Sequence, residues 1–336
     1  MDCYDHIVTD DEAGFRLDRF VADKKTELSR TLAQKLISDG YITVGGSRTK
    51  PSYKICAGDV VSVRLPETET HSGPRPENIP LDIVFEDDEV IVVNKPAGMV
   101  VHPAAGVDSG TLVNAFLAHI LPDTTTRKAE EPDIFSIDPE RPGVVHRIDR
   151  GTSGTIVVAK TANAYYSLVA QFKEHSTRRK YLALICGSPK QDSGTIVAPI
   201  GRSHRDRKKM AVTNTNSREA ITNFSVIERY GRFSLLEVTL ETGRTHQIRV
   251  HLAHIGYPVV GDPNYGGRNR AIKSAVSQDV RIALQQLSRQ ALHAQTLGFI
   301  HPVTNQYIEF SAPIPEDIQR VIDALRASES QREGSL

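Results

Sequence analysis

The spacing of apolar residues divides the chain into two parts with different patterns. Residues 15–63 contain two short segments in which apolar side chains recur every three or four positions, followed by two short apolar runs. This spacing predicts two amphipathic helices and two strands. From residue 81 onward, β-branched apolar runs predict strands, and a helical segment at 161–175 interrupts them. The strand-like runs are residues 82–96, 155–160, 180–187, 233–242 and 305–313.

These patterns predict an α+β fold, in which a small N-terminal domain precedes a larger domain with a mixed, mainly antiparallel sheet. Residues 66–80 are rich in Pro, Glu, Ser and Thr and have no periodicity, which is typical of a linker. We therefore expect the small domain at 14–65 and the large domain at 81–325. The last segment, 326–336, is polar, and we expect it to form a flexible tail.

The second predicted helix of the small domain is defined by its two ends and its apolar face. Leu32, Leu36 and Ile37 fall on one face of this helix. Ser29 is the expected N-cap, and Gly40 is the expected C-terminal stop. Basic side chains fall outside the apolar face and are therefore expected to be solvent-exposed.

Charge is distributed unevenly along the chain. The 41 basic residues balance the 41 acidic ones in the 336-residue sequence, so the net charge is zero. Between Arg16 and Arg64, however, basic side chains outnumber acidic ones by roughly two to one. A solvated surface without a partner is the alternative interpretation, but we favour a surface that binds RNA phosphates. The candidate residues are Arg16, Arg30, Lys35, Lys50 and Lys54.

Several classes of protein are disfavoured by the sequence. The three cysteines, Cys3, Cys56 and Cys186, share no Cys-x-x-Cys spacing, which argues against a disulfide framework or a structural zinc site. No apolar run approaches the roughly 20 residues that a membrane helix needs, and no secretion signal is recognisable. No Gly-x-x-x-x-Gly-Lys phosphate loop occurs. We therefore expect a cytoplasmic protein without a membrane anchor, a metal or a cofactor.

Candidate catalytic chemistry is concentrated in one polar turn. Residues 143–160 read GVVHRIDRGTSGTIVVAK, so His146, Arg147, Asp149 and Arg150 lie in a loop between two apolar runs. Loops held by rigid strands commonly carry catalytic residues. The protein-kinase catalytic loop has a similar string, but it requires Asp directly after Arg, a downstream Asn and a Gly-rich phosphate loop. The sequence does not contain this set, so the kinase hypothesis is rejected.

The string HRIDRGTSG at 146–154 resembles the HRLDxxTSG signature of the RluA family of pseudouridine synthases, with isoleucine in place of leucine. Three further blocks resemble that family in the same order, namely residues 92–103, 178–184 and 241–266. The small domain resembles the alpha-L RNA-binding fold, in its FRLDRF opening and its GYITVG turn. Together these likenesses point to the synthase D type of the family, which acts on large-subunit ribosomal RNA.

The resemblance implies that the protein isomerises specific uridines in RNA after flipping the base out of its stack. It implies that Asp149 is the catalytic carboxylate, acting either on the anomeric carbon or as a base toward the neighbouring ribose carbon. Arg249 is the implied cation that keeps Asp149 negatively charged. Tyr181 is implied to pack against the base while its hydroxyl handles a proton, and Arg147 is implied to occupy the space that the flipped base leaves.

A basic block at 201–210 suits phosphate contacts at the rim of the active site, although a solvated loop is an equal alternative. Its candidate residues are Arg202, Arg207 and Lys208. The implied partner is structured RNA, with 23S ribosomal RNA of the large subunit as the expected substrate, and we expect a monomer.

The sequence disfavours two other functions. A non-catalytic RNA-binding or ribosome-assembly factor would have no need of Asp149, so the presence of that residue favours an enzyme. A glycoside hydrolase needs a second carboxylate, and no other acid stands out near the motifs. Histidines 146, 246, 251 and 254 are better explained as ordinary hydrogen-bonded side chains than as metal ligands.

Overall fold

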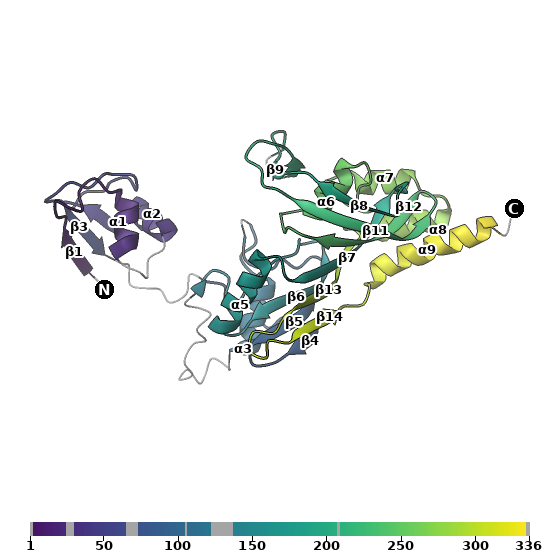
Figure 1. Ribbon diagram of the computed structural model, residues 1–336, viewed down its shortest axis with the longest axis horizontal. Helices are drawn as coiled ribbons and strands as arrows, with labels where there is room; N and C mark the ends of the chain where they lie inside the picture. Colours follow the sequence, from purple (N-terminus) through teal and green to yellow (C-terminus); the bar gives the residue numbers. More distant parts are fainter. Residues whose placement is uncertain are drawn as a thin grey trace. The chain divides into compact units, whose positions relative to one another are not determined.

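The chain folds into two compact units, comprising Met1–Ser72 and Gly73–Leu336. Their structure is known from a computed structural model, which describes residues 3–24, 30–64, 73–104, 106–121, 137–206 and 209–333. The division between the units lies inside the segment 66–80 for which we predicted a linker. Figure 1 shows the elements of each unit.

The N-terminal unit packs two helices against a small sheet. The helices are α1 (Leu17–Lys24) and α2 (Arg30–Asp39), and the sheet has the order β1-β3-β2. Its strands are β1 (Cys3–Ile7), β2 (Ile42–Val44) and β3 (Val60–Arg64). The core contains Leu17, Ile37 and Ile42, none of which is exposed. The pattern of apolar residues predicts both helices and the strands β2 and β3.

Two details of this unit bear on the predictions. Gly40 follows α2 with a positive φ of 86°, the left-handed geometry that ends many helices. Ser29, the expected N-cap, lies outside the described residues. Strand β1 was not predicted, because two of its larger apolar side chains, Tyr4 and Ile7, are exposed rather than alternating into a core. Its backbone pairing with β3 holds it instead.

The second unit is built on a mixed sheet, and the predicted fold class is confirmed. Among the described residues the sheet has nine strands in the order β4-β5-β6-β13-β7-β12-β11-β8, with β14 pairing with β13. The β6–β13 pair is parallel, and the other pairs are antiparallel. The strands are β4 (Ile83–Glu86), β5 (Val90–Lys95), β6 (Ser153–Ala159), β7 (Arg178–Cys186), β8 (Ser193–Val197), β11 (Ile221–Tyr230), β12 (Phe233–Leu240), β13 (Leu292–Ile300) and β14 (Tyr307–Ser311).

Helices cover both faces of the β5–β6 part of this sheet. Ile91 and Val93 pack with α3 (Leu112–Ile120), whereas Val90 and Val92 pack with α5 (Ala162–Lys173). Because successive side chains of a strand point to opposite faces, a strand covered on both faces reads as one continuous apolar run. This explains why β5 and β6 were evident from the sequence.

The other half of the sheet supports a second layer of helices, visible in Figure 1. Strands β7 and β12 share the largest core with these helices. The helices are α6 (Gln247–His254), α7 (Gly267–Lys273), α8 (Gln278–Gln286) and α9 (Glu316–Glu333). A separate hairpin, β9 (Ile200–Arg202) and β10 (Met210–Val212), packs beside α6.

Two segments are more structured than we expected. We predicted a flexible tail at 326–336, but α9 continues through this segment as far as Glu333. Leu325 and Ser328 are buried and anchor this part of the helix. Residues of the expected linker beyond 72 contact α3, because the side-chain amide of Asn114 donates to the Arg75 carbonyl. In both cases contacts with the rest of the second unit offset the conformational entropy that a polar segment loses when it becomes ordered.

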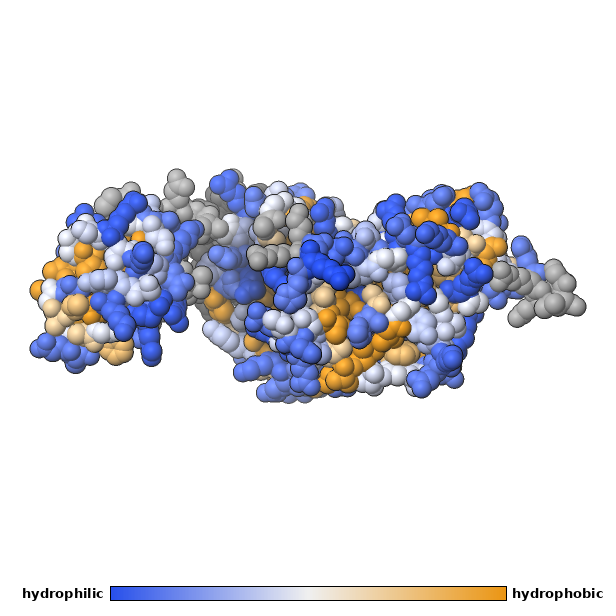
Figure 2. Space-filling view, turned by 90° about the horizontal axis from the view of Figure 1, so that it is seen from above, coloured by the Kyte–Doolittle hydropathy of each residue, from blue (hydrophilic) through white to orange (hydrophobic). Residues whose placement is uncertain are grey.

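Among the described residues, no helix is long and apolar enough to cross a membrane. Hydrophilic residues predominate on the face of each unit that Figure 2 presents. Exposed apolar side chains, such as Tyr166 and Val303, still occur on the second unit.

Candidate active site

The loop that carries Asp149 is fixed from several sides. Ile148 is buried in the main core, and the backbone N–H of Thr152 donates to the Asp149 carbonyl. On the next residue, the Arg150 carbonyl accepts from Gly98 N, and Arg150 Nε donates to the Gly98 carbonyl at 3.0 Å. These contacts hold Asp149 in the loop that precedes β6. The apolar run before this loop is not a strand, because it forms only an isolated bridge between Val144 and Val158.

Lys95, at the end of β5, supports the same loop from the interior. Its side chain is fully buried, and Nζ donates to the carbonyls of Pro96 and Met99 at 2.8 Å. A longer contact of 3.5 Å reaches the Arg150 carbonyl. Burial lowers the pKa of Lys95 to about 7, because an ammonium group without bulk water is penalised. Lys95 therefore joins the β5 turn to the Asp149 loop.

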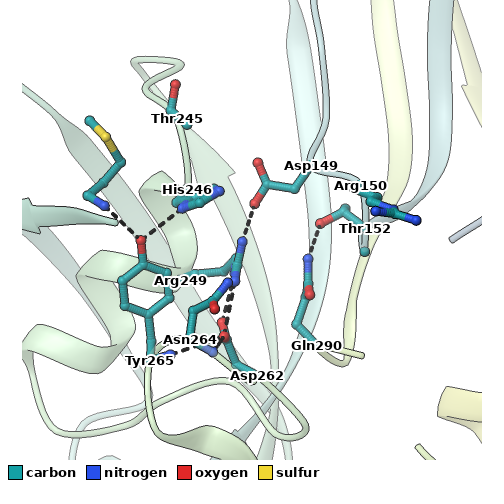
Figure 3. Close-up of polar contacts among 12 residues, drawn as sticks. Asp149, Arg150, Thr152, Thr245, His246, Arg249, Asp262, Asn264, Tyr265 and Gln290 are labelled. Carbon is teal, nitrogen blue, oxygen red and sulfur yellow. Dashed lines mark hydrogen bonds and ion pairs between the residues drawn. The ribbon is translucent and has the colours of Figure 1, made fainter. Parts of the chain in front are cut away.

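Arg249 on α6 holds Asp149 at the centre of the site (Figure 3). Its Nη1 donates to Asp149 Oδ2 at 2.9 Å. On the opposite side, Nε and Nη2 donate to both carboxylate oxygens of Asp262, at 2.7 and 3.0 Å. The Arg249 side chain is 4% exposed and that of Asp262 is not exposed at all, whereas 21% of the Asp149 side chain remains exposed. The carboxylate that reaches the surface of the site is therefore Asp149.

The opposite charges of Arg249, Asp149 and Asp262 stabilise one another. Burial alone lowers the pKa of Arg249, but its hydrogen bonds and proximity to Asp262 and Asp149 outweigh that effect and raise the pKa above its ordinary value. The guanidinium consequently stays charged and faces two anions. Asp262 also accepts hydrogen bonds from the backbone N–H groups of Asn264 and Tyr265, so its buried charge is well satisfied.

Asp149 and Tyr181 line one cavity of about 550 Å³. This volume falls within the roughly 300–1,000 Å³ typical of ligand pockets. Tyr181 lies on β7 and is 8% exposed, and burial raises the pKa of its hydroxyl. Asp149 is the one carboxylate among the described residues that line the cavity. The cationic lining residues are Arg141, Arg147, Lys173, Arg179, Arg244 and Arg249.

The structure brings the three predicted catalytic residues together and places Arg147 with them. Arg147 lines the same cavity, is exposed, and donates from Nη2 to Thr245 Oγ1 at 2.7 Å. Arg202, at the end of β9, is exposed on the hairpin and does not line the cavity. Arg207 and Lys208 lie outside the described residues.

The predicted basic residues of the N-terminal unit fall into two groups. Arg16 and Arg30 both donate hydrogen bonds to Asp18, whose carboxylate is fully buried. Part of their charge is therefore neutralised within the protein. The buried carboxylate also accepts from Gln34, and hydrogen bonds from Arg16 above all hold its pKa well below the usual range. The remaining candidates are exposed, namely Lys35, Lys50 and Lys54.

Sequence reasoning missed the residues behind Arg249. Asp262 lay inside a block matched to the family but received no role, and Tyr265 received none either. An isolated acid in the otherwise apolar stretch GYPVVGD was the available signal, because a charge in such a context is usually paired. Among the described residues, no group of three or more His, Cys, Asp or Glu side chains has the arrangement of a metal site.

Two protein-family models and several known proteins match this chain. The RNA pseudouridylate synthase family model matches residues 89–254, and the S4 domain model matches residues 15–61. The uncharacterized RNA pseudouridine synthase YlyB of Bacillus subtilis (strain 168) is 44% identical over 327 residues, which cover 97% of this chain and 99% of that protein. The ribosomal large subunit pseudouridine synthase D of Xanthomonas campestris is 44% identical over 95% of this chain and 92% of its own.

Two solved structures resemble the fold of this chain over about three quarters of its length. Human RNA pseudouridylate synthase domain containing 1 has a TM-score of 0.51 at 25% identity, covering 75% of this chain and 96% of that one. Human RNA pseudouridylate synthase domain containing 4 has a TM-score of 0.54 at 22% identity, covering 73% of this chain and 92% of its own. At this identity the comparison supports a shared fold and nothing further.

The fold and these relatives define an RNA-modifying isomerase with an S4 domain at its N-terminus. The chain belongs to the RNA pseudouridine synthases, and the resemblance drawn from its motifs is confirmed.

Proposed function

We propose that this synthase isomerises uridines in large-subunit ribosomal RNA, using Asp149 as its catalytic carboxylate. The observation that carries the proposal is the Arg249–Asp149 pair, which presents a single carboxylate to a cavity whose other charged lining residues, among those described, are arginines and a lysine. The substrate class is supported by relatives of 42–44% identity that are named ribosomal large subunit pseudouridine synthase D.

The reaction requires one bond to break and another to form on the same sugar. The N1–C1′ bond of uridine breaks, uracil rotates, C5 bonds to C1′, the C5 proton leaves, and N1 gains a proton. Asp149 can assist in either of two ways, by attacking C1′ or by removing the proton on the neighbouring ribose carbon. Both ways require an ionised carboxylate, which the hydrogen bond from Arg249 stabilises.

A uridine must leave its stack before C1′ can reach Asp149. Unstacking costs a few kcal/mol, and the enzyme must recover that energy through contacts with the extruded nucleotide and with the space it vacates. We assign Arg147 to that space, because it is exposed at the cavity beside Asp149 and is steadied by Thr245. Tyr181 is assigned to packing against the uracil inside the cavity and to proton transfer through its hydroxyl.

The proposal is tested by mapping pseudouridines in ribosomal and transfer RNA from cells with and without this gene. We expect sites in large-subunit RNA to disappear in the deletion strain and to return when the wild-type gene is restored. Purified protein should likewise modify an unmodified large-subunit transcript far faster than a transfer RNA transcript. Equal rates on the two transcripts would contradict the assignment to ribosomal RNA.

We predict that Tyr181→Phe slows turnover by more than about tenfold, because positioned proton transfer typically contributes roughly 10²–10⁴-fold. The ring that packs on uracil is retained, so RNA affinity should stay within about twofold. The measurement is the single-turnover rate of pseudouridine formation together with the dissociation constant for RNA. An unchanged rate would limit the role of Tyr181 to packing.

We predict that the exposed lysines of the N-terminal unit bind RNA phosphates. Replacing Lys35, Lys50 and Lys54 with Gln should flatten the dependence of log Kd on log salt by roughly one unit for each lost phosphate contact. Arg16 and Arg30 are left in place because they neutralise the buried Asp18. Binding is measured between low and physiological salt.

The matched control removes two exposed lysines of the second unit that do not line the cavity, Lys190 and Lys273. Their replacement with Gln should leave the salt dependence nearly unchanged. Identical slopes for the triple variant, the control and the wild type would contradict an RNA-binding role for the N-terminal lysines.

A further inference from the structure

Tyr265 lies behind the Arg249–Asp149 pair, at a point where three elements meet (Figure 3). The Arg249 guanidinium lies 5.0 Å from the centre of the Tyr265 ring, within the range of a cation–π interaction. The Tyr265 hydroxyl accepts from the backbone N–H of Met210 at 3.1 Å and hydrogen-bonds His246 Nδ1 at 2.8 Å. Tyr265 is not among the described residues that line the cavity.

With the ring beneath it, Arg249 has little freedom left. Its Nε and Nη2 are held by Asp262 and its Nη1 by Asp149, and the guanidinium carbon lies over the Tyr265 ring. A planar guanidinium that is held by a carboxylate on one edge and packed over an aromatic ring keeps one orientation. The direction in which Arg249 presents Nη1 to Asp149 is therefore set partly by Tyr265.

The Tyr265 hydroxyl also fixes a residue of the cavity wall. His246 precedes α6 with a positive φ of 59° and makes no side-chain cap to that helix. Its ring lines the cavity, and Figure 3 shows it between the Tyr265 hydroxyl and Asp149. Burial lowers the pKa of His246, which favours the neutral ring near neutral pH. A single hydrogen bond from the side facing away from Asp149 therefore orients this imidazole.

The third partner links the site to the basic hairpin. Met210 begins β10, and the β9–β10 hairpin packs on α6 through a small cluster that includes Ile200, Val250 and Tyr265. Val212 of β10 packs against both this cluster and the main core of the unit. The loop between β9 and β10 carries the exposed Arg205. Movement of the hairpin would thus alter the Met210–Tyr265 hydrogen bond.

We propose that Tyr265 is a positioning residue, which couples the placement of the β9–β10 hairpin to that of Arg249 and His246. The inference rests on the proposed function and deepens it. RNA phosphates that contact the hairpin favour the position in which the Met210 backbone N–H donates to the Tyr265 hydroxyl. This position aligns Arg249 with Asp149. Binding energy from RNA at the rim is thereby used to order the reacting groups.

The coupling is tested by a double-mutant cycle in the full-length protein on an unmodified large-subunit ribosomal RNA transcript. Tyr265→Phe keeps the ring under Arg249 and removes both hydroxyl hydrogen bonds, so the single-turnover rate at saturating RNA should fall about tenfold. The dissociation constant should change by less than about twofold, because Tyr265 does not line the cavity. Tyr265→Leu, which also removes the ring, should cost about tenfold more in rate.

Arg205→Gln is the second arm of the cycle. In the wild-type background it should weaken RNA binding and also slow the saturated rate a few-fold. In the Tyr265→Phe background it should still weaken binding but leave the rate unchanged, because the path from hairpin to Arg249 is already broken. Multiplicative rate losses would overturn the coupling, even if Tyr265→Phe alone proved slow through general destabilisation.

Two comparisons separate the possible failures. Tyr166→Phe, a change on the exposed surface of α5, should leave rate and affinity as in the wild type. If the wild-type enzyme is active and Tyr265→Phe has a saturated rate within about twofold of it, the inference is overturned but the proposed function stands. A wild-type enzyme that made no pseudouridine in large-subunit RNA would instead contradict the proposed substrate.

Discussion

Replacing Asp149 with Asn should abolish pseudouridine formation while RNA binding stays within a few-fold of the wild-type value. Loss of a general base typically costs roughly 10²–10⁴-fold, and loss of a nucleophile can cost about 10⁶-fold. The amide has the shape of the carboxylate but lacks its charge. A drop in rate without a drop in affinity is therefore expected in either chemical role of Asp149.

The contacts of Asp149 make this variant a clean test. Arg249 keeps both hydrogen bonds to Asp262 when Asp149 is neutralised, so the buried ion pair that supports α6 survives. Asp149 itself is partly exposed, which limits the cost of the change to folding. The melting temperature of Asp149→Asn should consequently lie close to that of the wild type.

The measurement follows the hydrogen on C5, which must leave when C5 bonds to C1′. RNA transcribed with tritium at that position should release the label with wild-type enzyme and retain it with Asp149→Asn. Asp323→Asn, an exposed change on α9, provides the control and should release tritium at the normal rate. Release by Asp149→Asn near the wild-type rate would defeat the proposed mechanism.

The sheet illustrates what sequence periodicity can and cannot predict. Strands β5 and β6 are buried on both faces by α3 and α5, so their sequences are continuous apolar runs. Strand β13 is equally central but contains His293 and Thr296, and it was not predicted. These polar groups are satisfied by partners from other segments, as when His293 Nδ1 meets Ser153 Oγ at 3.0 Å. A single window of sequence carries no information about such partners.

The same limit applies to charges. The motif resemblance predicts that Asp149, Arg249 and Tyr181 act together in catalysis, and all three line one cavity of the structure. The count of basic residues, by contrast, treated Arg16 and Arg30 like the exposed lysines of the same unit. Both arginines are tied to Asp18, because the fold brings residues 16, 18 and 30 together around a fully buried carboxylate. Charge counts cannot reveal which cations are neutralised in this way.

Replacing Arg249 with Met should reduce turnover by at least about 10²-fold, since breaking a buried ion pair by removing one partner typically costs about 3–5 kcal/mol. Two separate losses are expected from this change. Asp149 loses the cation that keeps it charged and aligned, and Asp262 is left fully buried without its bidentate partner. The second loss should also lower the melting temperature, so activity alone would not identify the role of Arg249.

A compensating variant separates the two effects. In Arg249→Met/Asp262→Asn the buried charge is removed along with its partner, while the amide oxygen still accepts from the Asn264 and Tyr265 backbone N–H groups. We expect the melting temperature to recover part of its loss while the single-turnover rate stays as low as in Arg249→Met, because Asp149 remains unpaired. Recovery of the rate together with stability would show that Arg249 serves only to neutralise Asp262. A loss of tenfold or less in Arg249→Met would show that Asp149 does not depend on this cation for its catalytic charge.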